Sequence, residues 1–168
     1  AELYDPATNT WSAAGAMSTV RRAASAVLLS TGKVLVAGGH ASLSYPFTDL
    51  TSADLYDPAT GTWSAAAPLN VGRAAAAMVT LPSGKVLFAA GYYNNSGEIY
   101  DPAANTFTTV AALSSPRWSP TGSLLPSGKV LVTGGVDGSG YTQSVTELYD
   151  PATNTWSPGA AMAKQRSR

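Results

Sequence analysis

The chain carries the phrase Glu2-Leu3-Tyr4-Asp5-Pro6-Ala7-Thr8-Asn9-Thr10-Trp11 and repeats it three more times with few changes. The later copies occupy residues 54–63, 98–107 and 147–156, so that successive tyrosines are 52, 44 and 49 residues apart. Self-similarity with a period of about fifty residues indicates a repeat architecture. A unit of this size cannot bury its apolar faces alone, so function should be sought on surfaces that several units build together.

A second phrase keeps step with the first. It reads Gly32-Lys33-Val34-Leu35-Val36-Ala37-Gly38-Gly39 and returns at residues 84–91 and 128–135. Its β-branched centre, which follows a turn, is typical of a strand. The glycine doublet that ends it suits positions where the backbone needs positive φ or approaches another segment closely.

Each unit contains four strand signals. In the first full unit we expect strands at residues 24–29, 34–37 and 53–56, and a short fourth strand that begins at Trp63. The turn at 57–62 carries a proline, which presets φ, and ends on a Gly or Asn, which tolerates the left-handed region.

Counting these signals divides the chain into complete and partial units. Residues 1–17 hold only the third and fourth strands, and they nearly duplicate residues 146–162. We predict a half unit at 1–17, complete units at 18–68, 69–112 and 113–161, and the start of a further unit at 162–168.

The repeated residues resemble the kelch repeat family over essentially the whole chain. The match rests on glycine doublets and on tyrosine–tryptophan pairs seven residues apart, and the middle unit departs mildly, with Ala90 for the first glycine and Phe107 for the tryptophan. The resemblance implies an all-β fold of kelch-type β-propeller blades, each a four-stranded antiparallel sheet whose first strand lines a central channel. We expect the following residues to pack the blades together: Tyr4, Trp11, Gly38, Gly39, Tyr56, Trp63, Tyr100, Phe107, Gly134, Gly135, Tyr149 and Trp156.

Three blades are too few for a comfortable ring, because propellers typically have four to eight. An open ring leaves two apolar blade faces bare, and such faces invite association. Two explanations remain open. The chain could be a piece of a longer propeller, or two chains could form a homodimer that completes a six-bladed ring, since closed symmetric assembly is common. In the second case the half unit could replace residues 146–157 of a neighbour.

The expected strand order sorts the loops between two faces of the disc. The turns at 30–33 and 57–62 barely vary between units and lie on one face, whereas the loops at 40–49, 92–97 and 136–143 vary and lie on the other. Variable loops on a rigid framework, rich in Tyr, Asn and Asp, are a common place for recognition. We predict that a protein or glycan ligand binds this variable-loop face through Tyr45, Tyr92, Tyr93, Asn95, Arg117, Trp118 and Tyr141.

An arginine recurs where each unit leads into its first strand. It appears as Arg21, Arg73 and Arg117, and again as Arg166 in the partial unit. Two interpretations are open for these residues. Together with Arg22 and Trp118 they could form a ring of donors around the channel mouth. Alternatively, they could bridge neighbouring blades, which suits a residue that recurs once per blade.

The composition of the chain argues against several classes of function. The net charge is zero and only 12% of the 168 residues are charged, so we expect no nucleic-acid partner. No run of eighteen apolar residues occurs, so we expect no membrane span. The absence of cysteine removes disulfides, thiolate metal sites and cysteine nucleophiles. Abundant Ala and Thr with scarce Lys favour a secreted or cell-surface location on a bacterium.

The sequence also lacks the residues of the enzymes that the resemblance brings into question. The galactose-oxidase-like enzymes of the kelch family need two histidines, tyrosines and a cysteine cross-linked to a tyrosine, whereas this chain has one histidine, His40, and no cysteine. We interpret His40 as a surface residue. No nucleophile elbow, P-loop or dinucleotide motif appears. We therefore predict a non-enzymatic binding module without cofactor or metal, and the alternative is a structural fragment or self-assembling half-propeller with no ligand of its own.

Overall fold

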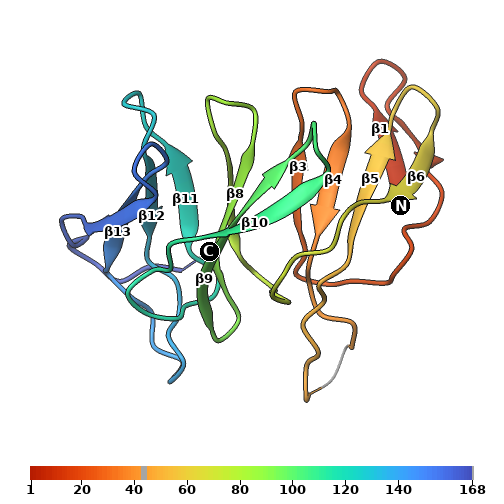
Figure 1. Ribbon diagram of the computed structural model, residues 1–168. Helices are drawn as coiled ribbons and strands as arrows, with labels where there is room; N and C mark the ends of the chain where they lie inside the picture. Colours follow the sequence, from red (N-terminus) through yellow and green to blue (C-terminus); the bar gives the residue numbers. More distant parts are fainter. Residues whose placement is uncertain (43–44, 168) are drawn as a thin grey trace.

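The structure is a computed structural model that describes residues 1–42 and 45–167, so Leu43 and Ser44 of the predicted variable loop lie outside it. The regular structure of the described residues consists of strands alone, arranged in three four-stranded antiparallel sheets and one two-stranded hairpin (Figure 1). Within the described ranges, no helix is long and apolar enough to cross a membrane. The sheets confirm the predicted all-β fold of four-stranded antiparallel blades.

The sheets follow one another along the chain, and we call them blades 1 to 3. Blade 1 contains β3 (Ser25–Leu28), β4 (Val34–Ala37), β5 (Ala53–Asp57) and β6 (Thr62–Ala65). Blade 2 contains β7 (Ala77–Thr80), β8 (Val86–Gly91), β9 (Asn94–Asp101) and β10 (Thr106–Val110). Blade 3 contains β11 (Thr121–Leu124), β12 (Val130–Thr133), β13 (Thr146–Asp150) and β14 (Thr155–Pro158). The N-terminal hairpin pairs β1 (Glu2–Asp5) with β2 (Thr10–Ala13).

The blades stand side by side, and their connections gather at two opposite ends. In Figure 1 the β3–β4 and β7–β8 turns point up, whereas the β4–β5 and β8–β9 connections point down. The first strands are neighbours, because β7 contacts both β3 and β11. The variable loops therefore share one end of the stack.

The core lies between the blades, because alternate residues of each middle strand point to opposite faces. In β8, Val86 and Phe88 join the core shared with blade 1, whereas Leu87 and Ala89 join the core shared with blade 3. Each outer pair of aromatic residues packs toward the preceding blade. The core with blade 1 includes Tyr100 and Phe107, and the core with blade 2 includes Tyr149 and Trp156.

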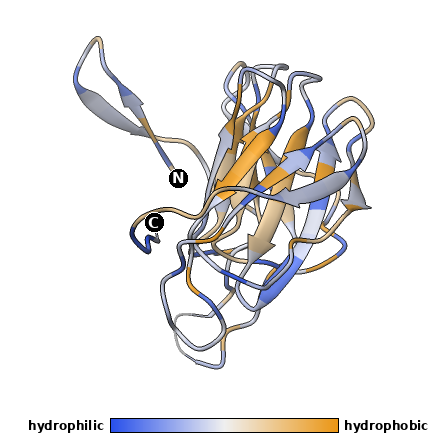
Figure 2. Ribbon diagram, turned by 90° about the vertical axis from the view of Figure 1, so that its left-hand side faces the viewer, coloured by the Kyte–Doolittle hydropathy of each residue, from blue (hydrophilic) through white to orange (hydrophobic). Residues whose placement is uncertain are grey.

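The N-terminal hairpin departs from the predicted packing role of its aromatic residues. Figure 2 shows the hairpin standing away from the sheets, and Tyr4 and Trp11 are 47% and 65% exposed. Their rings pack on each other with centroids 5.1 Å apart. They bury little because no other described strand pairs with β1 or β2, so these two residues do not hold blades together here. The hairpin is connected through Ala14, whose carbonyl accepts a hydrogen bond from Trp63 Nε1 at 2.8 Å.

Candidate functional site

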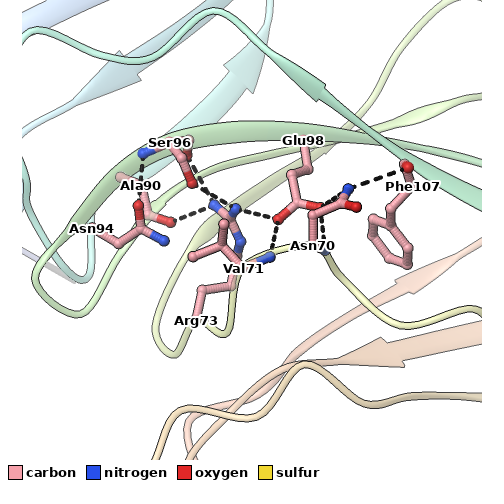
Figure 3. Close-up of polar contacts among 8 residues, drawn as sticks. All are labelled: Asn70, Val71, Arg73, Ala90, Asn94, Ser96, Glu98 and Phe107. Carbon is pink, nitrogen blue, oxygen red and sulfur yellow. Dashed lines mark hydrogen bonds and ion pairs between the residues drawn. The ribbon is translucent and has the colours of Figure 1, made fainter.

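Three of the recurring arginines, Arg21, Arg73 and Arg117, have buried side chains. Arg73 has a side chain that is 1% exposed, and its Nη2 lies 2.6 Å from Glu98 Oε1 (Figure 3). Its Nη1 donates to the carbonyl oxygens of Ala90 and Ser96, at 3.0 and 2.9 Å. Glu98 also accepts a hydrogen bond from the backbone N–H of Asn70 at 2.7 Å. Burial lowers the pKa of Arg73, and the hydrogen bond that it donates to Glu98 opposes that shift. A guanidinium nevertheless stays protonated in proteins, so this is a buried, hydrogen-bonded ion pair.

The same pair recurs in the other blades. Arg21 lies 2.6 Å from Asp54, and Arg117 pairs with Glu147. The acids sit two residues before the repeated tyrosine, and this period is the sequence signal that could have predicted the pairs. Each guanidinium bonds within its own blade, so the side chain does not bridge blades as one interpretation expected.

The backbone of the same arginines does connect blades. The N–H of Gly39 in blade 1 donates to the carbonyl of Arg73 at 2.8 Å, and the N–H of Gly91 in blade 2 donates to the carbonyl of Arg117 at 3.1 Å. Arg117 is only 1% exposed, and its charge is matched by Glu147. This burial removes Arg117 from the surface on which the sequence placed it as a ligand-binding residue.

Aromatic side chains from all three blades meet at the variable-loop face. Tyr92 is the centre of this group, because its ring lies 5.2 Å from His40, 5.9 Å from Phe47, 4.4 Å from Tyr93 and 5.3 Å from Trp118. The group combines the β4–β5 loop, the β8–β9 turn and the segment before β11. We call these five residues the aromatic cluster: His40, Phe47, Tyr92, Tyr93 and Trp118. The structure thus brings Tyr92, Tyr93 and Trp118 together, as members of one predicted binding surface.

His40 is the buried member of the cluster and does not lie at the surface. Its side chain is 6% exposed, stacks on Phe47 at 4.7 Å, and places Nδ1 2.8 Å from Asp49 Oδ1. Burial raises the pKa of Asp49, and His40 opposes that shift. The guanidinium of Arg22 lies over the ring of Phe47, 4.3 Å from the ring centroid. The expectation of a surface histidine is wrong, because Phe47 of its own loop and Tyr92 of blade 2 cover it.

The rim of the cluster is open to solvent. Tyr93 is 57% exposed, and Tyr45, whose ring lies 6.0 Å from Phe47, is 81% exposed. The blade 3 loop approaches from the other side, because a Cβ added to Gly138 would lie 3.5 Å from the Tyr93 ring. On that loop, Tyr141 is 69% exposed.

Two polar residues of the variable-loop face are already occupied by structural hydrogen bonds. Asn95 is half-buried, and its Nδ2 donates to the carbonyl of Leu113 at 2.8 Å. Asp137 accepts from the backbone N–H groups of Ser139 and Tyr141, at 2.9 and 3.0 Å, and so shapes the loop. Both side chains therefore hold the loops in place.

Comparison with known proteins identifies the repeats. Residues 21–70 and 117–163, more than half of the chain, match the Kelch motif. The chain belongs to the kelch repeat family. No curated protein sequence matches it significantly.

Solved structures share the kelch fold with this chain. The protein YjhT superposes with a TM-score of 0.77 at 14% identity, over 94% of this chain and 57% of YjhT. A fungal alcohol oxidase of the AA5 family, solved in complex with copper, superposes with a TM-score of 0.66 at 22% identity, over 82% of this chain and 30% of the oxidase. This chain therefore spans less than two thirds of either protein, and identities this low show the fold alone.

The described part of this kelch chain contains no cluster of metal-ligating side chains. Across residues 1–42 and 45–167, no three His, Cys, Asp or Glu side chains come together as a metal site would require. The sole histidine of the sequence is enclosed by Phe47, Tyr92 and Asp49. What the site does offer is a contiguous aromatic surface on a rigid framework.

Proposed function

We propose that this kelch chain is a non-enzymatic module that binds a protein or a glycan through its variable-loop face. The observation that carries the proposal is the aromatic cluster with its open rim, to which all three blades contribute. Tyr45 and Tyr93 are exposed at this rim, and the blade 3 loop carries a further exposed tyrosine, Tyr141. Exposed aromatic residues on a rigid scaffold supply large contact area at low conformational entropy cost, which favours recognition.

The charges near the cluster support recognition by shape and hydrogen bonding over recognition by charge. Arg117 is paired with Glu147, Asp49 faces His40, and Arg22 lies over the Phe47 ring. The tyrosine hydroxyl groups and ring faces at the rim suit a ligand that has both apolar and hydroxyl-rich surface. A glycan or the surface of a protein meets this description.

The non-enzymatic part of the proposal is supported by the residues present. The chain has a single histidine, which is buried against an acid, and no cysteine. The AA5 oxidase resembles the chain in fold alone, and its activity does not transfer with the fold. A secreted or bacterial cell-surface location remains a prediction from composition.

The test is a screen of the purified chain on a glycan array and against a displayed peptide library. The best ligand from either screen is then titrated against Tyr93→Ala and Tyr45→Ala. We expect both substitutions to weaken binding strongly, with unchanged melting temperature. Tyr4→Ala, an exposed tyrosine on the N-terminal hairpin, is the matched control and should bind normally. Binding that survives the rim substitutions, or no ligand in both screens, would contradict the proposal.

A structural role without a ligand is the second candidate, and one observation favours it. Residues 2–12 and 147–157 are identical in sequence, and their hairpins pair in the same register. A chain that carries two copies of one blade element is suited to assembly. This structural role would be favoured if neither the glycan array nor the peptide library gave a ligand.

A further inference from the structure

We propose that blade 3 binds a primary carboxamide in a cavity beside Glu147, at the place that the side chain of Asn70 occupies in blade 2. No residue of the aromatic cluster lines this cavity, and the proposal does not rest on the function proposed above. It depends on one difference between two equivalent links of the chain, where Ser114 stands in place of the asparagine.

The links that lead into blades 2 and 3 approach the buried acids in the same way. The backbone N–H of Asn70 donates to Glu98 Oε2 at 2.7 Å, and that of Ser114 donates to Glu147 Oε2 at 3.0 Å. The leucine that precedes each of these link residues is buried in both cases. The two positions are therefore equivalent in backbone and differ in the side chain that they carry.

In blade 2 the carboxamide of Asn70 lies between two acceptors (Figure 3). Its Nδ2 donates to Glu98 Oε2 at 2.8 Å and to the carbonyl oxygen of Phe107 at 3.3 Å. A primary carboxamide carries two N–H donors on one nitrogen, so it can serve both acceptors at once. Asn70 is exposed although blade 3 follows blade 2, so this place beside the outer strand opens to solvent.

In blade 3 the shorter side chain of Ser114 leaves the equivalent place open. A cavity of about 410 Å³ lies there, and Ser114, Glu147 and Trp156 are among its lining residues. Trp156 has the strand position of Phe107, because each is paired with the repeated tyrosine of its blade. The equivalents of the two atoms that hold the Asn70 carboxamide are thus Glu147 Oε2 and the Trp156 carbonyl oxygen, and both belong to residues that line the cavity.

Glu147 has capacity to accept a further hydrogen bond. From the part of the chain that the structure describes, it accepts the backbone N–H of Ser114 and a bond from Arg117. Glu98 has the corresponding bonds and also accepts from the Asn70 side chain. An ionised carboxylate can accept about four hydrogen bonds, and Glu147 is only 5% exposed. A donor that reaches it through the cavity therefore supplies a bond that bulk water supplies poorly.

The charges at the cavity select a neutral ligand. Arg117 already matches the charge of Glu147, as Arg73 matches Glu98 beside the neutral Asn70. An ammonium group would bring an unmatched charge to this pair, and a carboxylate would be repelled by Glu147. Much of the remaining lining is apolar and suits a short hydrocarbon body: Ala112, Val145, Pro158 and Ala161. The chemistry that fits is a primary carboxamide on a short apolar group.

Blade 1 does not offer the same combination of residues. Its link also has a serine, Ser18, but its acid is Asp54, whose side chain is one carbon shorter than that of Glu147. Of the three blades, only blade 3 joins a short link residue to the longer acid, so we assign the site to blade 3 alone.

The first test is an NMR titration of the isotope-labelled full chain with propionamide. The amide signal of Ser114 and the indole N–H signal of Trp156 should shift and saturate, because both residues line the cavity. The indole signal of Trp11, on the N-terminal hairpin, is the internal control and should not move. Butanone has the shape of propionamide but no N–H donor, and it should bind at least about tenfold more weakly. No saturable shift with propionamide, or equal binding of butanone, would overturn the proposal.

Two opposite substitutions test the assigned place. Ser114→Asn supplies the chain's own carboxamide, so it should abolish the propionamide shifts without lowering the melting temperature. Ser115→Asn is the matched control, since Ser115 is an exposed neighbour outside the cavity lining, and it should bind normally. Asn70→Ser should open a second site beside Glu98, detected at the amide of Val71, which donates to Glu98 Oε1 at 3.1 Å. Undiminished binding to Ser114→Asn, or no new site in Asn70→Ser, would refute the assignment.

A further arm of the titration distinguishes the two sources of a carboxamide, a free small molecule and an asparagine side chain of a peptide. The second probe is asparagine blocked as its N-acetyl, N-methylamide derivative. Binding about tenfold tighter than that of propionamide would assign the site to a peptide side chain, and weaker binding would assign it to a free amide. Either result supports the carboxamide site, whereas equal affinity of the blocked aspartate derivative would contradict it, because a carboxylate lacks the N–H donors.

Discussion

The hydroxyl group of Tyr56 has no hydrogen-bond partner, because Gly61 stands at the turn position where the other repeats have asparagine. Elsewhere the asparagine Oδ1 accepts from the tyrosine hydroxyl five residues earlier, as in the 3.0 Å contact from Tyr100 to Asn105. The same oxygen accepts the N–H of Ala67 from the preceding blade at 3.0 Å. One asparagine therefore both closes the turn and connects two blades.

We predict that Gly61→Asn stabilises the chain by about 1 kcal/mol, from a new hydrogen bond and a less flexible unfolded chain. Gly61 has φ +68°, close to the 51° and 54° of Asn105 and Asn154, and a Cβ there would meet nothing within 4 Å. Urea unfolding measures the change. Gly61→Ala is the control and should not stabilise, because alanine supplies no acceptor and disfavours positive φ.

The buried ion pairs should be far more sensitive than the exposed ones. We predict that Glu98→Gln destabilises the chain by about 3 to 5 kcal/mol, because it leaves the buried Arg73 charge unmatched. The exposed pair of Lys85 and Asp101, 2.9 Å apart, is the comparison, and Lys85→Gln should cost less than about 1 kcal/mol. Equal losses in urea unfolding would show that Arg73 does not depend on its acid.

Acid should weaken the turns of all three blades. The pKa values of Asp57, Asp101 and Asp150 are lowered, first by a hydrogen bond from a lysine and then by backbone N–H groups of the turn. A carboxylate with a lowered folded pKa stabilises the fold above its unfolded pKa, and this contribution disappears as pH falls through the folded value. We predict a loss of stability below about pH 4, near the ordinary value for aspartate. Asp101→Asn should make the unfolding free energy less dependent on pH there, and an unchanged slope would contradict the assignment.

The strands were predictable because their signals are local. The strand expected at 34–37 matches β4, and the one expected at 24–29 exceeds β3 by one residue at each end. Turn residues and alternation act within a few positions, so a single sequence contains them. Each observed sheet also falls within one of the predicted complete units.

Burial was less predictable because it depends on neighbours distant in the chain. Residues 2–12 and 147–157 are identical, yet Tyr4 is 47% exposed and Tyr149 only 1%. The difference is that blade 2 packs against Tyr149, whereas no described sheet packs against Tyr4. His40 became buried for the same reason, because Tyr92 of another blade covers it. The arginine–acid pairs also join positions more than twenty residues apart.

Gly38, the first glycine of the blade 1 doublet, has no room for a side chain. A Cβ on Gly38 would overlap the carbonyl oxygen of Arg73, which begins the next blade, and Gly38 has φ +68°. We predict that Gly38→Ala costs more than about 2 kcal/mol in urea unfolding. Gly134→Ala should cost less, because there the Cβ meets the carbonyl of Arg166, which lies in an exposed segment.

Blade 2 shows how the fold accommodates alanine at this position. Ala90 stands in place of the first glycine at φ +61°, and the pairing of β8 with β9 shifts register between Ala89 and Gly91. The following Gly91 has φ +140°, against +95° for Gly39. The backbone therefore rearranges around the extra methyl group, and the long β8–β9 hairpin permits it. Because blade 1 has a long loop in place of that hairpin, Gly38→Ala cannot use the same adjustment, and a loss as small as that of Gly134→Ala would contradict this explanation.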